Sequence, residues 1–137
     1  MITFNYQTAF VLKNESQTSS WVQKIIDSEG YQTGDISYVF CDNNYLNTMN
    51  VEFLSHDTYT DIISFDYSSG KHLQGEIYIS IQRVAENAKE FHTSFENELH
   101  RVIVHGILHF MGYKDKTTEE KKAMRIKENN SLKKLTH

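Results

Sequence analysis

Residues 93–112, TSFENELHRVIVHGILHFMG, decide the fold of this chain because they predict a long, well-delimited helix. Their leucine, valine and isoleucine residues recur at the spacing of one helical face. Thr93 and Glu96 fit a capping box at the start, and Gly112 stands where a C′ glycine ends a helix. The stretch therefore predicts a helix over Phe95–Met111, around which the rest of the domain packs.

Two histidines on this helix point to a metal. His105 and His109 are four residues apart, so their side chains share one helical face and can reach one tetrahedral zinc ion at about 2.0–2.1 Å. Gly112 lets the chain turn back, and Asp115 follows soon enough to supply a third ligand. Three protein ligands with one open position are typical of catalytic zinc. We expect one zinc ion per chain, although two histidines and a carboxylate also suit iron or nickel.

Two other metal-site classes fit the sequence less well. In HExxH zinc proteases a glutamate follows the first histidine as general base, and here that place is Gly106. A closed structural zinc site needs a fourth ligand. The nearest histidines are His92, which precedes the helix, and His100, which lies some 140° around the helix from His105. Gly106 itself costs about 1 kcal/mol in a helix, so either close packing or room for a substrate offsets it.

The remaining chain predicts strands and helices that interleave without strict alternation. We expect an α+β fold in a single domain, residues 1–137, with a mixed sheet of about four strands packed against several helices and the metal site on a central helix. Ser19 or Ser20 is expected to cap the first helix, and Thr117 with Glu120 forms a capping box for the last. The other predicted elements are strands at Ile2–Tyr6, Asp35–Cys41, Ile62–Tyr67 and Glu76–Ile81, and helices at Asp42–Leu54 and Val84–Phe91.

The composition limits which classes of protein this chain can belong to. The chain has 137 residues, 39% of them hydrophobic and 23% charged, which fits one globular domain. No apolar run approaches the ~20 residues of a membrane span, and the N-terminus has no signal-peptide pattern. We therefore expect a cytoplasmic protein with no membrane partner. The single cysteine, Cys41, is expected to be buried in a strand, with a reactive thiol as the alternative.

Charge is unevenly distributed along the chain. Residues 1–113 carry 6 Lys and Arg against 14 Asp and Glu, a net of −8, whereas residues 114–137 carry 8 against 4, a net of +4. The basic tail is therefore the expected contact for a polyanion. The favoured interpretation, because runs of charge are usually only solvated, is a helix face in which three cations pair with three carboxylates, namely Lys121, Lys122 and Arg125 with Glu119, Glu120 and Glu128.

Several separate motifs resemble one known family. Residues 105–113, HGILHFMGY, resemble the HGxLHxxGYDH signature of the YbeY family of metal-dependent rRNA-maturation endoribonucleases. Upstream, residues 60–65, TDIISF, resemble its TDVLSF strand, and residues 75–80, GEIYIS, resemble its GDIxIS strand. Residues 49–57 resemble its LNxxYRxxD segment. The resemblance covers about residues 35–132, in order and with compatible spacing.

Two positions depart from the family pattern. Asp115 stands where the family's last signature histidine is usual, and aspartate is also a zinc ligand, so the site is altered rather than lost. Leu54 stands at the place of an arginine that is thought to help the family engage RNA phosphate. Leucine offers neither charge nor forked donors, which puts catalytic efficiency in doubt, and whether the nearby His56 substitutes is left open.

The resemblance implies a single-strand-specific, zinc-dependent endoribonuclease involved in 16S rRNA 3′-end maturation and ribosome quality control. Its partners would be single-stranded RNA, such as the 16S rRNA precursor, and ribosomal particles or proteins. The alternative, favoured by Leu54, is a ribosome-assembly factor that binds pre-ribosomal particles with weak or no nuclease activity. A zinc-bound water would act as nucleophile on phosphorus or as base toward the 2′-OH. The sequence identifies no other catalytic base.

Four residues are candidates for contact with RNA, because single strands are held by cations and aromatic faces. Lys71 and His72 lie in the turn before the fourth predicted strand, Arg101 lies on the metal helix, and Tyr113 lies beside the metal site. Each also has a plain structural interpretation: Lys71 and His72 as turn residues, Arg101 as a surface charge, and Tyr113 as a packing residue.

Overall fold

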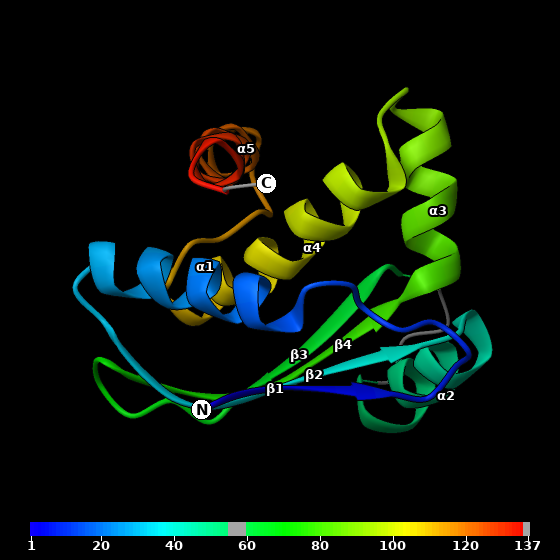
Figure 1. Cartoon of the computed structure of the whole chain (residues 1–137), viewed down its shortest axis with the longest axis horizontal. Helices are drawn as coiled ribbons and strands as arrows, with labels where there is room; N and C mark the ends of the chain where they lie inside the picture. The colour runs from blue at the N-terminus through cyan, green and yellow to red at the C-terminus, as the bar shows by residue number, and fades with distance from the viewer. Residues whose placement is uncertain (55–59, 136–137) are drawn as a thin grey trace.

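The computed structural model describes residues 1–54 and 60–135, and in this part the chain forms four strands and five helices (Figure 1). The helix-forming and strand-forming segments largely follow the periodicity of the sequence. In chain order the elements are β1 (Ile2–Tyr6), α1 (Glu15–Ser28), β2 (Gln32–Cys41), α2 (Asn43–Leu54), β3 (Ile62–Asp66), β4 (His72–Ser80), α3 (Ile81–Glu90), α4 (Phe95–Phe110) and α5 (Thr118–Lys133).

The strands form one mixed sheet in the order β1-β2-β4-β3. The pairs β1–β2 and β2–β4 are parallel, and β3–β4 is an antiparallel hairpin. This confirms the predicted α+β fold with a mixed, four-stranded sheet. No helix in the described residues combines the length and apolarity that crossing a membrane requires.

The helix α4 lies at the centre of the molecule, between the sheet and α5 (Figure 1). Two buried hydrogen bonds fix its surroundings: Tyr38 Oη donates to the carbonyl of Ile103 at 2.9 Å, and Trp21 Nε1 donates to the carbonyl of Ser131 at 2.8 Å. The first ties β2 to α4, and the second ties α1 to α5. The buried side chains that α4 contributes to the hydrophobic core are Leu99, Val102, Ile103, Val104, Ile107, Leu108 and Phe110.

Two of the predicted helix N-caps are wrong. The first helix begins at Glu15 after Asn14, which has a φ of 59°, so Ser19 and Ser20 lie inside α1 and the predicted cap was wrong. The first turn of α1 is polar, which hid it from a search for apolar periodicity. At α4 the N-cap is Ser94, whose Oγ accepts from the Asn97 backbone N–H at 3.0 Å. The predicted capping box of Thr93 with Glu96 was therefore wrong, because the cap lies one residue later.

The other helix ends follow their sequence signals. Thr117 and Glu120 form the predicted capping box of α5, with both reciprocal hydrogen bonds. Gly112 has a φ of 96°, a conformation that L side chains rarely adopt, and its N–H donates to the carbonyl of His109 at 3.0 Å. The helix α4 ends at Phe110 with Met111 as its C-cap, one residue short of the predicted end, and Gly112 redirects the chain toward α5.

Gly106 faces the sheet rather than a substrate cleft. A Cβ placed on this residue would lie 3.0 Å from two side-chain atoms of Ile77 and 3.2 Å from one of Ile62. Of the two explanations that the sequence left open, the structure supports close packing of α4 against β3 and β4.

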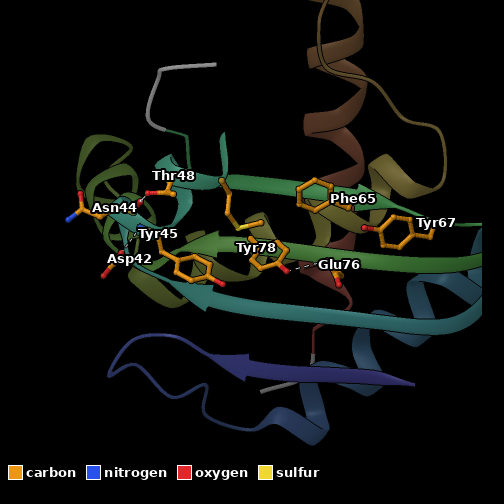
Figure 2. Close-up of a pocket in the computed structure, with 9 residues that line it drawn as sticks. Asp42, Asn44, Tyr45, Thr48, Phe65, Tyr67, Glu76 and Tyr78 are labelled. Atoms are coloured by element: carbon orange, nitrogen blue, oxygen red, sulfur yellow. Dashed lines mark hydrogen bonds between the residues drawn. The ribbon is translucent and has the colours of Figure 1, made fainter. Parts of the chain in front are cut away.

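The opposite face of the sheet carries a separate cavity of about 780 Å³ (Figure 2). Because successive strand residues alternate between faces, Tyr78 and Phe65 point away from α4, whereas Ile77 and Ile79 point toward it. Among the described residues, the lining is aromatic and acidic and contains no lysine, arginine or histidine. Its residues are Asp42, Asn44, Tyr45, Thr48, Met49, Phe65, Tyr67, Glu76 and Tyr78.

Cys41 is fully buried at the end of β2, as expected, and its Sγ lies 3.5 Å from the carbonyl of Ile79. Burial, with the nearby charge of Asp42, raises the pKa of this thiol to about 12. Since the thiolate is the reactive form, we expect Cys41 in the folded chain to react with iodoacetamide at pH 8 at least about 100-fold more slowly than in urea. Mass spectrometry of timed aliquots measures both rates, and equal rates would contradict the buried, protonated state.

Candidate metal centre

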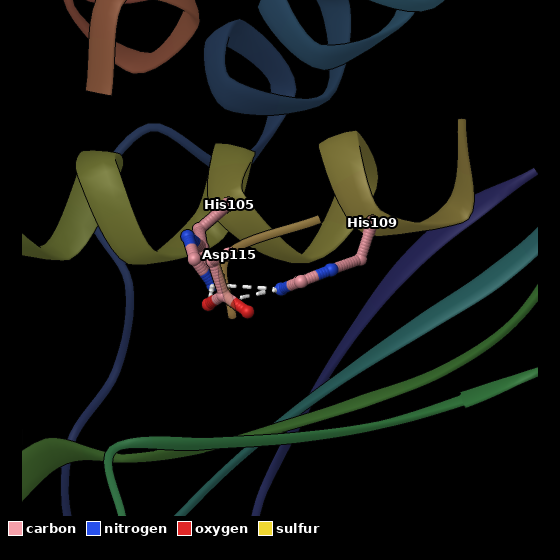
Figure 3. Close-up of side chains that lie close together, drawn as sticks. All are labelled: His105, His109 and Asp115. Atoms are coloured by element: carbon pink, nitrogen blue, oxygen red, sulfur yellow. Dashed lines mark hydrogen bonds and ion pairs between the residues drawn. The ribbon is translucent and has the colours of Figure 1, made fainter. Parts of the chain in front are cut away.

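The structure brings the three predicted ligands together (Figure 3). His105 and His109 project from one face of α4, and the turn at Gly112 returns the chain so that Asp115 faces both imidazoles. The turn is held by the Tyr113 backbone N–H, which donates to the carbonyl of Leu108 at 3.0 Å. Within residues 1–54 and 60–135 this is the one group of three histidine, cysteine or acidic side chains arranged so that it could hold a metal ion.

The donor atoms form a nearly regular triangle. The His105 and His109 Nε2 atoms are 2.9 Å apart, and Asp115 Oδ2 lies 3.2 Å from the first and 3.4 Å from the second. Bonds of about 2.0–2.1 Å in a tetrahedron place neighbouring donor atoms roughly 3.3–3.4 Å apart. Two of the three edges match this value closely, and the third needs only a small outward movement of the rings. The donor set and its spacing therefore fit a tetrahedral ion with one position left for a non-protein ligand.

Glu128 fixes the orientation of His105. Its Oε2 lies 2.7 Å from Nδ1 of His105, so the ring donates Nδ1–H to the carboxylate and presents the Nε2 lone pair to the cluster. This is the carboxylate–histidine arrangement that sets the tautomer of metal-binding histidines. Only 6% of the Glu128 side chain is exposed, which makes the interaction strong and specific. From the sequence, Glu128 is expected to pair with cations on a solvated helix face. It does lie 3.7 Å from Arg125, but it is buried rather than on the surface.

Arg101 holds Glu128 in turn. Its Nη1 lies 3.1 Å from Glu128 Oε1, and its Nε lies 3.6 Å from Glu98 Oε1. The Arg101 side chain is 16% exposed and is paired with these two carboxylates, so it is not the free surface charge that the sequence suggested. Contact of Arg101 with RNA stays a prediction. Its place in the structure is behind the metal cluster, as a support for the carboxylate that holds His105.

Acidic groups surround His105 and tune its protonation. Burial on its own lowers the pKa of His105, but the hydrogen bond to Glu128 and the charges of Glu128, Asp115 and Asp61 outweigh burial and leave the pKa raised. Asp61, just before β3, is a carboxyl that sequence reasoning missed; burial raises its pKa, and His105 lowers it in part. The carboxylates around His105 therefore favour a positive charge at the cluster, and a divalent cation would compete with a proton for it.

The other candidate RNA contacts lie in different surroundings. Tyr113 donates from its hydroxyl to Glu29, and Lys127 Nζ lies 5.3 Å from the Tyr113 ring centroid, so this residue packs beside the end of α4. Lys71 lies in the β3–β4 hairpin with its Nζ 4.2 Å from the Tyr31 ring centroid. His72 is not in the turn, because it is the first residue of β4. Contact of these residues with RNA stays a prediction.

Two further positions raised by the sequence are placed as follows. His100 packs edge-on against Trp21 with ring centroids 5.5 Å apart, so it belongs to the α1–α4 contact rather than to the metal cluster. Leu54 is the last residue of α2. Its side chain, and the whole of His56, lie outside the part of the chain that the structure describes.

Comparisons with known proteins agree on one family. The family model described as Endoribonuclease YbeY matches residues 2–136. The chain is 52% identical over 132 residues to the Endoribonuclease YbeY of Flavobacterium johnsoniae, covering 96% of this chain and 95% of that protein. It is 53% identical over 131 residues to the Endoribonuclease YbeY of Christiangramia forsetii, covering 96% and 92%.

A solved structure has the same fold. The solution structure of TM1509 from Thermotoga maritima matches with a TM-score of 0.66 and 27% sequence identity, covering 98% of this chain and 89% of that one. The similarity therefore extends over the sheet and all the helices that carry the metal cluster.

Proposed function

The chain belongs to the YbeY family of endoribonucleases, and on that premise we propose that it is a zinc-dependent hydrolase that cleaves single-stranded RNA. We propose that it acts in 16S rRNA 3′-end maturation and in ribosome quality control. Its partners are then the 16S rRNA precursor and ribosomal particles, and its place is the cytoplasm. The names of its relatives support the endonuclease activity, and the zinc and the specific rRNA step rest on the resemblance of its motifs.

One observation carries the proposal, namely the triangle of His105 Nε2, His109 Nε2 and Asp115 Oδ2. A zinc ion held by these atoms supplies Lewis-acid polarisation of a phosphoryl oxygen and activation of water. The chain's own part is to hold the three donors in place: α4 sets the two imidazoles, and Glu128 sets the tautomer of His105. The half-exposed Asp115 leaves one side of the cluster open toward solvent, where a phosphodiester could approach.

The alternative is a ribosome-assembly factor with weak or no nuclease activity, and Leu54 is the feature that favours it. An arginine is expected at this position in the family, and leucine provides no donors to a phosphate. Under this alternative the metal cluster would serve the fold, and RNA or ribosomal particles would bind without being cut.

Cleavage assays separate these two functions. Zinc-loaded protein is incubated with an end-labelled single-stranded RNA and with the same strand in a duplex, before and after chelation and zinc re-addition. We expect cleavage of the single strand only, lost on chelation and restored by zinc. Asp115→Ala should abolish it, whereas the matched control Asp27→Ala, an exposed aspartate on α1, should leave it unchanged. Metal-independent cleavage, or equal activity in Asp115→Ala, would refute the enzyme proposal.

A further inference from the structure

The metal cluster opens into a cavity whose far side is basic. This cavity of about 440 Å³ lies between the cluster and the N-terminal half of α5. Three cations from that half of α5 line it, spaced so that they follow one side of the helix: Lys121, Lys122 and Arg125. The cavity is completed by His105, Asp115, Thr118, Met124 and Glu128.

The acidic side chains of this cavity are paired, whereas two of its three basic side chains are not paired within the described part of the chain. Its two carboxylates, Asp115 and Glu128, are already engaged with the imidazoles of the cluster. Among the described residues, neither Lys121 nor Lys122 forms an ion pair with any acidic side chain, and both are exposed. Arg125 lies 3.7 Å from Glu128, but 52% of its side chain is exposed. Lys121 and Lys122 are therefore available to a polyanion, whereas Arg125 is shared with Glu128.

From this geometry we propose that Lys121, Lys122 and Arg125 form the binding surface for the phosphate backbone of the RNA strand that enters the metal cluster. The inference rests on the proposed function, and it names which part of the chain holds the substrate. A strand crossing the cavity would place one phosphodiester at the cluster and the neighbouring phosphates along α5. Lysine and arginine side chains that contact the phosphates hold a single strand without regard to its base sequence.

The inference also accounts for the missing arginine at Leu54. Cations on α5 border the cluster from the side of Asp115 and Glu128, and they can supply the phosphate contacts that leucine does not. The second cavity, across the sheet, is a poor alternative for RNA, because the charged residues among its described lining are both acidic, Asp42 and Glu76. Of these two cavities, the one beside α5 is therefore the better match for a polyanion.

Binding to an oligonucleotide tests the inference without relying on cleavage. Zinc-loaded protein is titrated into a fluorescein-labelled, 2′-O-methyl single strand of about 12 nucleotides at several salt concentrations, and a gel checks that the probe stays intact. The test variant is Lys121→Gln with Lys122→Gln. The matched control is Lys133→Gln with Lys134→Gln, which removes the same charge from the end of the same helix, about 18 Å away and beyond the screening length of about 8 Å.

We expect the test variant to bind about 10- to 30-fold more weakly at 0.1 M salt, and its slope of log Kd against log salt to fall by about 1.4, since each single-strand phosphate contact contributes about 0.7. The control should keep the wild-type slope, and Lys121→Arg with Lys122→Arg should restore binding. Equal losses in both glutamine variants, or no loss in either, would overturn the inference. Lysine-dependent binding in a wild type that cleaves no RNA would support this surface while refuting the proposed function.

Discussion

Replacing Glu128 with alanine should lower the affinity of the cluster for zinc by about 10- to 100-fold, the usual effect of losing the carboxylate behind a metal-binding histidine. The substitution removes the acceptor 2.7 Å from His105 Nδ1, so the ring can take the other tautomer or rotate away from His109. It also removes the carboxylate 3.1 Å from Arg101, whose side chain is 16% exposed. Breaking a buried pair by removing one partner costs about 3–5 kcal/mol, so a Tm decrease should accompany the metal effect.

Two variants separate the metal effect from the loss of stability. Glu128→Gln keeps an oxygen acceptor for His105 but removes the charge, so we expect an intermediate zinc affinity. Glu119→Ala, an exposed acid on the same helix, should change neither zinc affinity nor Tm. Competition against a chromogenic zinc chelator measures the affinity, and thermal unfolding measures the Tm. A zinc affinity for Glu128→Ala equal to that of wild type would show that Glu128 does not orient the ligand.

A side chain introduced at Gly75 should destabilise the fold more than one introduced at Gly106 in α4. Gly75 lies in β4, paired with Ile36 on one side and Asp66 on the other. A Cβ there would collide with the Phe65 backbone carbonyl and lie 2.6 Å from the Phe110 ring. Because a backbone atom in a sheet cannot rotate away, we expect Gly75→Ala to cost about 3 kcal/mol or more and to lower the Tm by about 10 °C.

Gly106→Ala provides the comparison. Its Cβ would lie 3.0–3.2 Å from the ends of isoleucine side chains, and alanine gains about 1 kcal/mol of helix propensity over glycine. The net change in unfolding free energy should therefore be at least about 2 kcal/mol smaller than for Gly75→Ala. Urea denaturation of both variants measures the difference. Comparable costs would contradict the close contact of β4 with Phe65 and the C-terminal end of α4.

Local sequence signals predicted most of the fold. Apolar periodicity located the helix of residues 95–110, and the alternating pattern of Ile2–Tyr6 located an edge strand with its observed bounds. The sequence also predicted the reversal at Gly112 and the start of α5 at Thr117, because each depends on one residue type in one backbone conformation. The errors at Ser19 and Thr93 arose where several neighbouring polar residues could each cap a helix.

Contacts of the candidate site between residues far apart in the chain could not be predicted from the sequence. The spacing of His105, His109 and Asp115 predicted a cluster because all three lie within one helix and one turn. The support for His105 comes from Glu128, 23 residues away on another helix, and no spacing rule joins them. A signal was nonetheless present, because Met124, Glu128 and Ser131 share the buried face of α5. An acid on an apolar helical face has a partner in most structures, and here that partner is a predicted metal ligand.

The most direct test is to measure the zinc content and the RNA cleavage of the same two samples, wild type and His109→Ala, purified without chelators. The proposed zinc-dependent nuclease function predicts about one zinc per wild-type chain, with cleavage of single-stranded RNA, and loss of both in His109→Ala, whose triangle lacks the donor 2.9 Å from His105 Nε2. Wild-type protein that holds no stoichiometric metal, or a His109→Ala variant that retains zinc and cleaves RNA as well as wild type, would contradict it.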